Sequence, residues 1–287
     1  MTLTLVRAWT TAKQRLEAAG LAGPVIDARL LVEAAAEATR ADIVTDPHRL
    51  LTSDQQARLE DYLNRREHRE PVAQILGRKG FWKLMLTVNE NVLTPRPDTE
   101  TLVEYVLRDF PQHAARRVLD LGVGSGAILL SILAERPAAR GLGVDISDEA
   151  LAVARDNAAT LGLAGRCALL RGDWTSGLAD AGFDLVVANP PYIASSVIET
   201  LEPEVRSYEP RIALDGGADG LDAYRRLAPE ILRVLKPGGR FAVEIGFDQR
   251  ETVEALFRAA GAEEVITLRD LADRDRVVAG AKKFLET

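Results

Sequence analysis

Residues 118–126 read Val118-Leu119-Asp120-Leu121-Gly122-Val123-Gly124-Ser125-Gly126, and this stretch decides the fold. Its first residues are mostly apolar, as expected of a buried β-strand, and three alternate glycines then allow a tight turn. The apolar residues from Gly126 to Ala134 have the length and composition of a helix. A strand, a glycine-rich turn and a helix in this order are typical of a doubly wound α/β domain.

The chain around this stretch alternates strands with helices. Strands are predicted at 117–121, 141–145, 183–188 and 239–245, helices at 126–134, 148–161, 221–235 and 249–260, and a closing antiparallel pair at 265–268 and 276–279. Segment 183–188 has little polarity, as expected at the buried centre of a parallel sheet. The alternation therefore predicts an α/β fold with a doubly wound, mostly parallel sheet.

The first part of the chain has a different pattern. Apolar residues recur at helical spacing between Leu5 and Leu16, so that one stripe of side chains can face a core. Ser53 followed by Gln56 resembles a capping box and predicts the start of a further helix. No convincing catalytic cluster lies in these helices, so we expect a small bundle that recognises a substrate or braces the rest of the protein.

Three domains follow from these patterns. We expect a helical substrate-recognition domain over 1–72 and a β-hairpin linker over 73–98, where glycines and Asn89-Glu90-Asn91 separate short apolar runs. The α/β domain occupies 99–287, and its first helix is expected to begin near Thr99.

The composition limits the possible partners. The chain has 287 residues and a formal net charge of −7, which weakens a nucleic-acid-binding interpretation because phosphate neutralisation needs a basic face. It has no membrane-spanning stretch and no signal-like N-terminus, so we expect a cytoplasmic monomer without stable nucleic-acid or membrane binding. The single cysteine, Cys167, excludes a cysteine-cluster metal site, and its apolar context predicts a buried thiol. No metal is expected.

Asp145 closes the strand that follows the glycine turn. An acid at this place can accept hydrogen bonds from ribose hydroxyls, either in a dinucleotide or in S-adenosyl-L-methionine. Gly122-x-Gly124-x-x-Ala127 also satisfies the dinucleotide fingerprint. These features indicate an adenosine-type cofactor without choosing between the two, and a turn without a ligand or a helix-capping Asp145 are the structural alternatives.

The segment Asn189-Pro190-Pro191-Tyr192 directly follows the predicted strand 183–188. Ligands of such folds lie outside the carboxyl ends of the strands, so this segment is expected beside the glycine turn. The Asn189 side-chain oxygen and the Pro190 carbonyl can accept hydrogen bonds from an NH2 group, and the prolines hold these acceptors in place. Tyr192 can stack on the planar group that carries the nitrogen. The segment predicts methylation of an amide or amino nitrogen, whereas an ordinary Asn-Pro turn is the structural alternative.

Trp174 follows Arg171-Gly172-Asp173, which we expect to come after a further strand of the sheet, third along the chain and placed between 145 and 171 without exact bounds. At that place its ring can form one wall of an adenine pocket, with Asp173 near the exocyclic amine. A tryptophan that belongs only to the core is the ordinary alternative.

The sequence resembles the release factor, or protein-(glutamine-N5), methyltransferases, a family of class I S-adenosylmethionine-dependent methyltransferases. Residues 120–126 together with 189–192 match the signature of class I enzymes that act on amide or exocyclic nitrogens. More specific is Thr94-Pro-Arg-Pro-Asp-Thr-Glu100, which is similar to the family's linker motif I-P-R-P-[DE]-T-E with Thr94 in place of isoleucine. Further similar stretches, such as Glu244-Ile-Gly246, extend the resemblance from about residue 70 to the end.

This resemblance implies a seven-stranded, mostly parallel sheet and a role for each site residue. The residues implied to hold S-adenosyl-L-methionine are Gly122, Val123, Gly124, Ser125, Gly126, Asp145, Trp174 and Asn189. Those implied to clamp the substrate are Asn189, Pro190, Pro191 and Tyr192, among which Asn189, Pro190 and Tyr192 are the catalytic residues. Arg96 and Glu100 are expected to help shape the site. The implied substrate is the glutamine of the Gly-Gly-Gln motif in class I peptide-chain release factors.

Three other functions compete with this one. A DNA or RNA base N-methyltransferase, acting on adenine N6 or guanine N2, would use the same clamp on an extruded base, but it calls for a basic track around the pocket. A cofactor-binding protein without catalysis would have no reason to keep the clamp. A dehydrogenase would account for the glycine turn and Asp145 but not for the segment 189–192.

Overall fold

The computed structural model describes residues 3–111, 113 and 115–284. The chain forms two compact units. The first consists of Met1–Arg78 together with Glu202–Tyr208, and the second of Lys79–Leu201 together with Glu209–Thr287.

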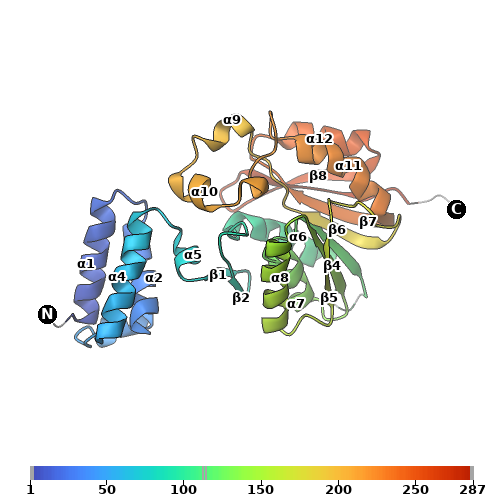
Figure 1. The fold of residues 1–287 in the computed structure, drawn as a ribbon. Helices are drawn as coiled ribbons and strands as arrows, with labels where there is room; N and C mark the ends of the chain where they lie inside the picture. The colour runs from blue at the N-terminus through green and yellow to red at the C-terminus, as the bar shows by residue number, and fades with distance from the viewer. Residues whose placement is uncertain (1–2, 112, 114, 285–287) are drawn as a thin grey trace. The chain divides into compact units, whose positions relative to one another are not determined.

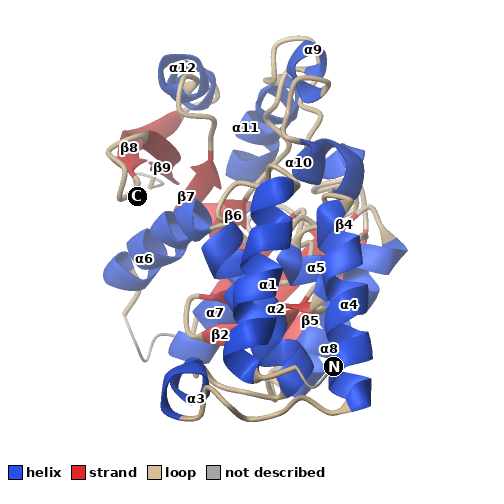
Figure 2. Ribbon diagram, turned by 90° about the vertical axis from the view of Figure 1, so that its left-hand side faces the viewer, coloured by secondary structure: helices blue, strands red, loops and turns tan. Residues whose placement is uncertain are grey.

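The first unit is a helical bundle. It contains α1 (Leu5–Ala18), α2 (Pro24–Ala36), α3 (Arg40–Thr45), α4 (Ser53–Glu67) and α5 (Val72–Ile75). Helices α1, α2 and α4 pack side by side (Figures 1 and 2). The capping box of α4 is formed by Thr52 and Gln55, so the prediction of Ser53 and Gln56 was wrong by one residue. Ser53 is already the first residue of the helix, and the hydroxyl one position earlier accepts from the Gln55 backbone N–H at 3.2 Å.

A short helix from far along the chain completes this bundle. It is α10 (Pro203–Tyr208), and a buried guanidinium, that of Arg66, contacts Glu204 at 3.1 Å and Asp27 at 2.8 Å. The Tyr208 hydroxyl donates to the His68 carbonyl at 2.7 Å. Sequence patterns did not foresee this pairing, because nothing in a six-residue helix states which surface it will meet.

The second unit is built on a seven-stranded sheet within the described residues. In spatial order its strands are β5 (Cys167–Arg171), β4 (Arg140–Asp145), β3 (Arg117–Leu121), β6 (Phe183–Ala188), β7 (Leu235–Glu244), β9 (Asp275–Lys282) and β8 (Ala262–Arg269). All neighbouring pairs are parallel except those made by β9. A separate two-stranded sheet pairs β1 (Arg78–Phe81) with β2 (Leu84–Thr87). The mostly parallel sheet is the one predicted.

Helices cover both faces of the large sheet (Figure 1). One face packs against α6 (Glu100–Asp109), α7 (Ala127–Glu135) and α8 (Asp148–Thr160), the other against α11 (Asp222–Val234) and α12 (Arg250–Ala259). The core on the side of α6, α7 and α8 is called the first core, and the one on the side of α11 and α12 the second core. Successive side chains of a strand point to opposite faces, so Val118 belongs to the first core and its neighbour Leu119 to the second. The remaining short elements are η1 (Pro97–Thr99), α9 (Ser195–Ile198) and η2 (Arg211–Ala213).

The sheet register brings three loops to one edge. Leu121 at the end of β3 pairs with Val144 of β4 on one side and with Ala188 of β6 on the other. The segments that follow these strands therefore meet outside the carboxyl ends of the sheet.

Two predictions about the chain as a whole can be compared with the structure. Cys167 on β5 is partly exposed rather than buried, because β5 is an edge strand. Burial is still sufficient to raise the pKa of its thiol to about 11. Among the described residues, no helix has both the length and the apolar character needed to cross a membrane.

Candidate active site

The glycine turn after β3 forms the floor of a cavity of about 290 Å³. Gly122 has φ +74°, and a Cβ added there would lie 3.5 Å from the Trp174 ring. Gly126 has φ +84° and caps α7, and a Cβ there would come within 2.8 Å of the Leu130 side chain. Both positions need glycine for their backbone conformation, but Gly122 faces the cavity and Gly126 faces the core.

Asp145 joins the end of β4 to the glycine turn. Its Oδ2 accepts from the Gly124 N–H at 2.9 Å, and its Oδ1 accepts from the Ser147 N–H at 3.0 Å. The side chain lines the cavity, and each carboxylate oxygen can accept more than one hydrogen bond. The carboxylate is thus held by two backbone donors with capacity left for hydroxyl donors of a ligand.

Trp174 forms a neighbouring wall of the same cavity. Its backbone has φ +53°, a conformation that residues with side chains rarely adopt, and its ring packs on the second core. Asp173 also lines the cavity, but its carboxylate is paired with Arg226 at 2.8 Å. Trp174 therefore lies beside the glycine turn, whereas Asp173 already has a partner of its own.

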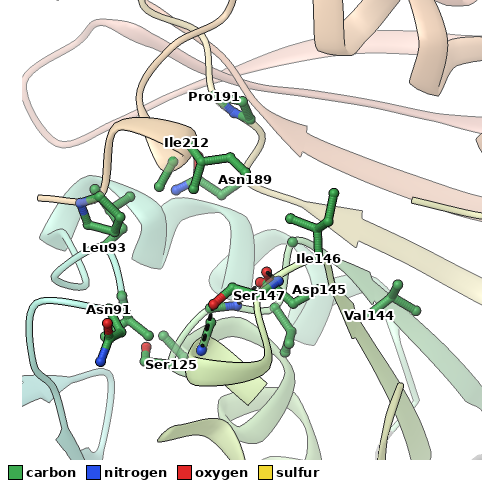
Figure 3. Close-up of a pocket in the computed structure, with 18 of the residues that line it drawn as sticks. Asn91, Leu93, Ser125, Val144, Asp145, Ile146, Ser147, Asn189, Pro191 and Ile212 are labelled. Carbon is green, nitrogen blue, oxygen red and sulfur yellow. Dashed lines mark hydrogen bonds between the residues drawn. The ribbon is translucent and has the colours of Figure 1, made fainter. Parts of the chain in front are cut away.

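The segment after β6 lies at the opposite side of the cavity (Figure 3). Asn189 and Pro191 line it, and Pro190 between them is buried. In Figure 3, Asn189 lies beside Ile212 and across the cavity from Ser125 and Asp145. The Asn189 amide nitrogen donates to the Thr99 hydroxyl at 3.4 Å. The side-chain amide of Asn189, which has Thr99 as a hydrogen-bond partner, thus lies across the cavity from the glycine turn.

Tyr192 has a different environment from its neighbours. Its ring packs on the second core and its hydroxyl donates to Glu244 Oε1 at 3.2 Å. Burial and the nearby Glu244 charge raise the pKa of Tyr192 well above its ordinary value. Tyr192 does not line the cavity in this structure, so the stacking role expected of it stays a prediction.

Residues of the linker motif 94–100 line a third side of the cavity. Of the two linker residues expected to shape the site, Arg96 and Glu100, only Arg96 lines it. Arg96 and Thr99 line the cavity, and the Arg96 guanidinium contacts the buried Glu209 carboxylate at 3.0 Å. Glu209 also accepts from the Thr94 N–H at 2.9 Å. Burial raises the pKa of Glu209, and the Arg96 charge opposes this rise. These contacts bind the linker to Glu209, which precedes Ile212 of the cavity lining by three residues.

Glu100, the other linker residue expected to shape the site, lies outside the cavity lining. Its carboxylate accepts from the Trp82 N–H at 2.8 Å and so holds the β1–β2 turn. Ile146 and Ser147, which follow Asp145, do line the cavity and were not predicted. Their position in the chain directly after Asp145, which was expected at the cavity, could have indicated that they line it.

The cavity suits an adenosine-type ligand. It lies at the lower end of the usual size range for small-molecule sites. It combines a close backbone approach at Gly122, an acid at Asp145 and an aromatic wall at Trp174. A backbone turn, an acid and an aromatic ring around one cavity are groups that can contact an adenosine-type ligand.

Comparison with known proteins identifies the family. Residues 7–77 match the model of the PrmC N-terminal domain, and residues 112–269 match that of a methyltransferase domain. A release factor glutamine methyltransferase from Caulobacter vibrioides is 68% identical over 287 residues, which is 100% of this chain and 99% of that protein. The chain belongs to the release factor glutamine methyltransferase family. A further member, from Agrobacterium fabrum, is 43% identical over 93% of both chains.

Solved structures show the same fold at low sequence identity. A methyltransferase from Pyrococcus furiosus matches with TM-score 0.51 and 16% identity, over 81% of this chain and 100% of that one. A ribosomal protein L11 methylase from Lactobacillus delbrueckii subsp. bulgaricus matches with TM-score 0.50 and 21% identity, over 71% and 90%. The fold is that of class I methyltransferases, and S-adenosyl-L-methionine is the cofactor of the family. The alternative of a base N-methyltransferase is not favoured by these relatives.

Proposed function

We propose that this chain transfers the methyl group of S-adenosyl-L-methionine to the side-chain amide nitrogen, N5, of the glutamine in the Gly-Gly-Gln motif of class I peptide-chain release factors. The observation that carries the proposal is that Asn189 and the glycine turn line one cavity. The identity with relatives over nearly the whole chain supports the same reaction.

The chemistry explains why this segment is suited to an amide. An amide nitrogen is a poor nucleophile, because its lone pair is delocalised into the carbonyl. Acceptors at the Asn189 side-chain oxygen and the Pro190 carbonyl would hold the two N–H groups and turn the lone pair toward the methyl group. S-adenosyl-L-methionine supplies a methyl group already activated on a positively charged sulfur, so positioning accounts for most of the catalysis. As the N–CH3 bond forms, the S–CH3 bond would break, the cofactor would leave as a neutral thioether, and one N–H proton would pass to water.

The cofactor would be held by the residues after β3 and β4. In this proposal Gly122 to Ser125 approach the methionine part through their backbone, Asp145 accepts from the ribose hydroxyls, and Trp174 forms the adenine wall. Gly126 acts through the packing of α7. Pro191 shapes the cavity beside Asn189, and the stacking of Tyr192 on the planar amide stays a prediction, because its ring packs on the second core in this structure.

The helical first unit would recognise the release factor. A protein substrate does not need a strongly basic surface, which agrees with the formal charge of −7. A monomeric state, a cytoplasmic location and the lack of stable nucleic-acid binding are predictions that accompany the proposal.

A labelling experiment tests the substrate. Purified protein and labelled S-adenosyl-L-methionine are incubated in three separate samples. The first contains a class I release factor, the second the same factor with its Gly-Gly-Gln glutamine changed to alanine, and the third duplex DNA. We expect label only in the unchanged factor, with mass spectrometry placing one methyl group on that glutamine. Label in DNA alone, or in both release factors equally, contradicts the proposal.

A further inference from the structure

The side chain of Gln249 joins three loops, which lie after β6, after β7 and before α11. Its Nε2 donates to the Tyr192 carbonyl at 2.9 Å and to the Gly220 carbonyl at 3.1 Å. Its Oε1 accepts from the Gly246 N–H at 2.9 Å. Only this orientation of the amide satisfies all three partners, because a reversed amide would place its oxygen against two carbonyls. The half-buried side chain of Gln249 is therefore fixed in direction.

The place of Gln249 in the chain makes this use of its side chain informative. Gln249 is the N-cap residue of α12, where Ser, Thr, Asp and Asn are preferred because their short side chains accept from the first N–H groups of the helix. The Gln249 side chain makes no such bond. Its carbonyl still accepts from the Val253 N–H at 3.0 Å, as in any helix start. The side chain thus binds the loops and not the helix that it precedes.

The segment Asn189–Tyr192 depends on anchors of this kind. It contains two consecutive prolines, which have no backbone N–H to donate. At its first end it continues from Ala188, which is held in the sheet. At its last end the Tyr192 carbonyl accepts from Gln249, and the following N–H, that of Ile193, donates to the Leu214 carbonyl at 3.0 Å. The direction of the segment is therefore set by the sheet at one end and by these bonds at the other.

Gly220 packs directly against the bond between Gln249 and Tyr192. It has φ +76°, and a Cβ added there would collide with the Tyr192 carbonyl oxygen and would lie 2.8 Å from Gln249 Nε2. The backbone before α11 thus approaches the segment as closely as a glycine allows. Because no free space surrounds the bond, a side chain without the amide cannot be replaced there by a rearrangement of Gly220.

We propose that Gln249 is a positioning residue for methyl transfer, which holds the Tyr192 carbonyl and thereby sets the direction of the two acceptors at Asn189 and Pro190. Gln249 lies outside the cavity lining, so it acts through this backbone and not on the ligand. The inference rests on the proposed function, because the direction of the acceptors matters only if they hold the N–H groups of an amide. A misplacement of about 1 Å is enough to slow such a reaction strongly.

The first test is Gln249→Met, which nearly keeps the length of the side chain and removes its donors and its acceptor. With a release factor as substrate, we expect kcat to fall about 10- to 100-fold, because the acceptors lose their alignment. The dissociation constant for S-adenosyl-L-methionine, measured by calorimetry, should stay within about twofold. None of the hydrogen bonds of Gln249 reaches the glycine turn or Asp145, so cofactor binding has no reason to change.

Gln249→Glu tests whether the two N–H donors are the groups that matter. It keeps the shape of the side chain and an acceptor for the Gly246 N–H, but an ionised carboxylate has no proton to donate to Tyr192 or Gly220. At alkaline pH, where a glutamate is ionised, kcat should fall at least as much as in Gln249→Met. If Gln249→Glu turns over within about twofold of the wild type there, filled space is sufficient and the inference is wrong.

Lys282→Met is the matched control. The Lys282 Nζ donates to the Leu235 carbonyl at 2.8 Å and to the Arg233 carbonyl at 3.5 Å, at the end of β7 opposite to Gly246. This variant also removes a side-chain donor from two backbone carbonyls and introduces the same residue. We expect its kcat to stay within about twofold of the wild type at a temperature well below its melting temperature. An equal fall of kcat in Lys282→Met and Gln249→Met would mean that both changes only loosen the domain, and it would overturn the inference.

Amide hydrogen exchange gives a readout that does not depend on activity. The Ile193 N–H should be protected in the wild type, because it is bonded to the Leu214 carbonyl. In Gln249→Met it should exchange faster, since the carbonyl just before it is no longer held, whereas in Lys282→Met it should not change. Equal exchange of Ile193 in the wild type and in Gln249→Met contradicts the proposed positioning.

The outcomes distinguish the inference from the function on which it rests. If the wild type methylates the release factor and Gln249→Met does so within about twofold, the inference alone is overturned. If the wild type does not methylate the release factor at all, the proposed function is overturned and the role of Gln249 in methyl transfer falls with it.

Discussion

The two sides of the cavity are built in different ways. The side proposed to hold the cofactor is lined by Gly122 to Ser125 after β3, by Asp145 at the end of β4 and by Trp174 after β5. The acceptor side consists of side chains from segments far apart in the chain, such as Asn189, Thr99 and Ile212. The first side is thus made of short segments that each directly follow a strand of the sheet, whereas the other side joins loops that do not all follow strands.

This difference has a physical cause. A nucleotide-like ligand is recognised at the end of a strand by a turn whose shape depends on a few glycines, so a short sequence is sufficient. A planar amide would be recognised by oriented acceptors, and their orientation depends on side chains from other segments, such as Thr99, whose hydroxyl accepts from the Asn189 amide nitrogen at 3.4 Å. Substitutions on the side of Asn189 should accordingly lower kcat, whereas those on the side of the glycine turn should raise the dissociation constant for S-adenosyl-L-methionine.

The strongest test of this division is Asn189→Ala. It removes the side-chain acceptor and leaves the glycine turn unchanged. We expect kcat with a release factor to fall by about 10²- to 10³-fold or more, while S-adenosyl-L-methionine binding remains measurable by calorimetry. Turnover equal to that of the wild type would remove the clamp mechanism. A loss of cofactor binding as large as the loss of kcat would show that the two sides are not separable.

Asp145→Ala tests the other side with a smaller expected effect. Hydrogen bonds to a charged group contribute about 1.5–3 kcal/mol, so the dissociation constant for S-adenosyl-L-methionine should rise about 10- to 100-fold. At saturating cofactor, kcat should change little. Asp148→Ala is the control, because Asp148 is an exposed acid on α8 that pairs with Arg171. Equal affinities of the wild type and Asp145→Ala would leave Asp145 with a structural role only.

The same division explains how much the sequence could predict. Local patterns predict the order of strands and helices and the glycine turn. The position of Asn189 beside that turn follows because the segments after neighbouring parallel strands meet outside the carboxyl ends of the sheet. Trp174 was expected at this cavity because it follows a strand of the same sheet, and it does line the cavity; the bounds of that strand, β5, were not predicted.

What the sequence did not predict depends on contacts between distant segments. Nothing in the order of residues indicates that Glu209 would hold Thr94 and Arg96, or that Glu204 would meet Arg66. Such pairs are set by the three-dimensional path of the chain, which local propensity does not determine. Gly126, which the resemblance grouped with the cofactor residues, lies beside Leu130 and outside the cavity lining, so its role toward the cofactor stays a prediction.

The two glycines of one motif give the finest test of the comparison, with the smallest expected effects. Gly122→Ala places a methyl group 3.5 Å from the Trp174 ring, in a cavity wall, at φ +74°. We expect a rise of a few-fold in the dissociation constant for S-adenosyl-L-methionine, since left-handed backbone costs an alanine about 1–2 kcal/mol and the wall must adjust.

Gly126→Ala places its methyl group within 2.8 Å of the Leu130 side chain, away from the cavity lining. Overpacking of this kind costs about 1–3 kcal/mol, so the melting temperature should fall by several degrees in differential scanning calorimetry. Cofactor affinity well below that temperature should stay near the wild-type value, because the strain lies between α7 and its own glycine cap. If Gly126→Ala weakens cofactor binding as much as Gly122→Ala does, the whole glycine run acts as one ligand-binding unit. The separation of a cavity-facing glycine from a core-facing one would then be wrong.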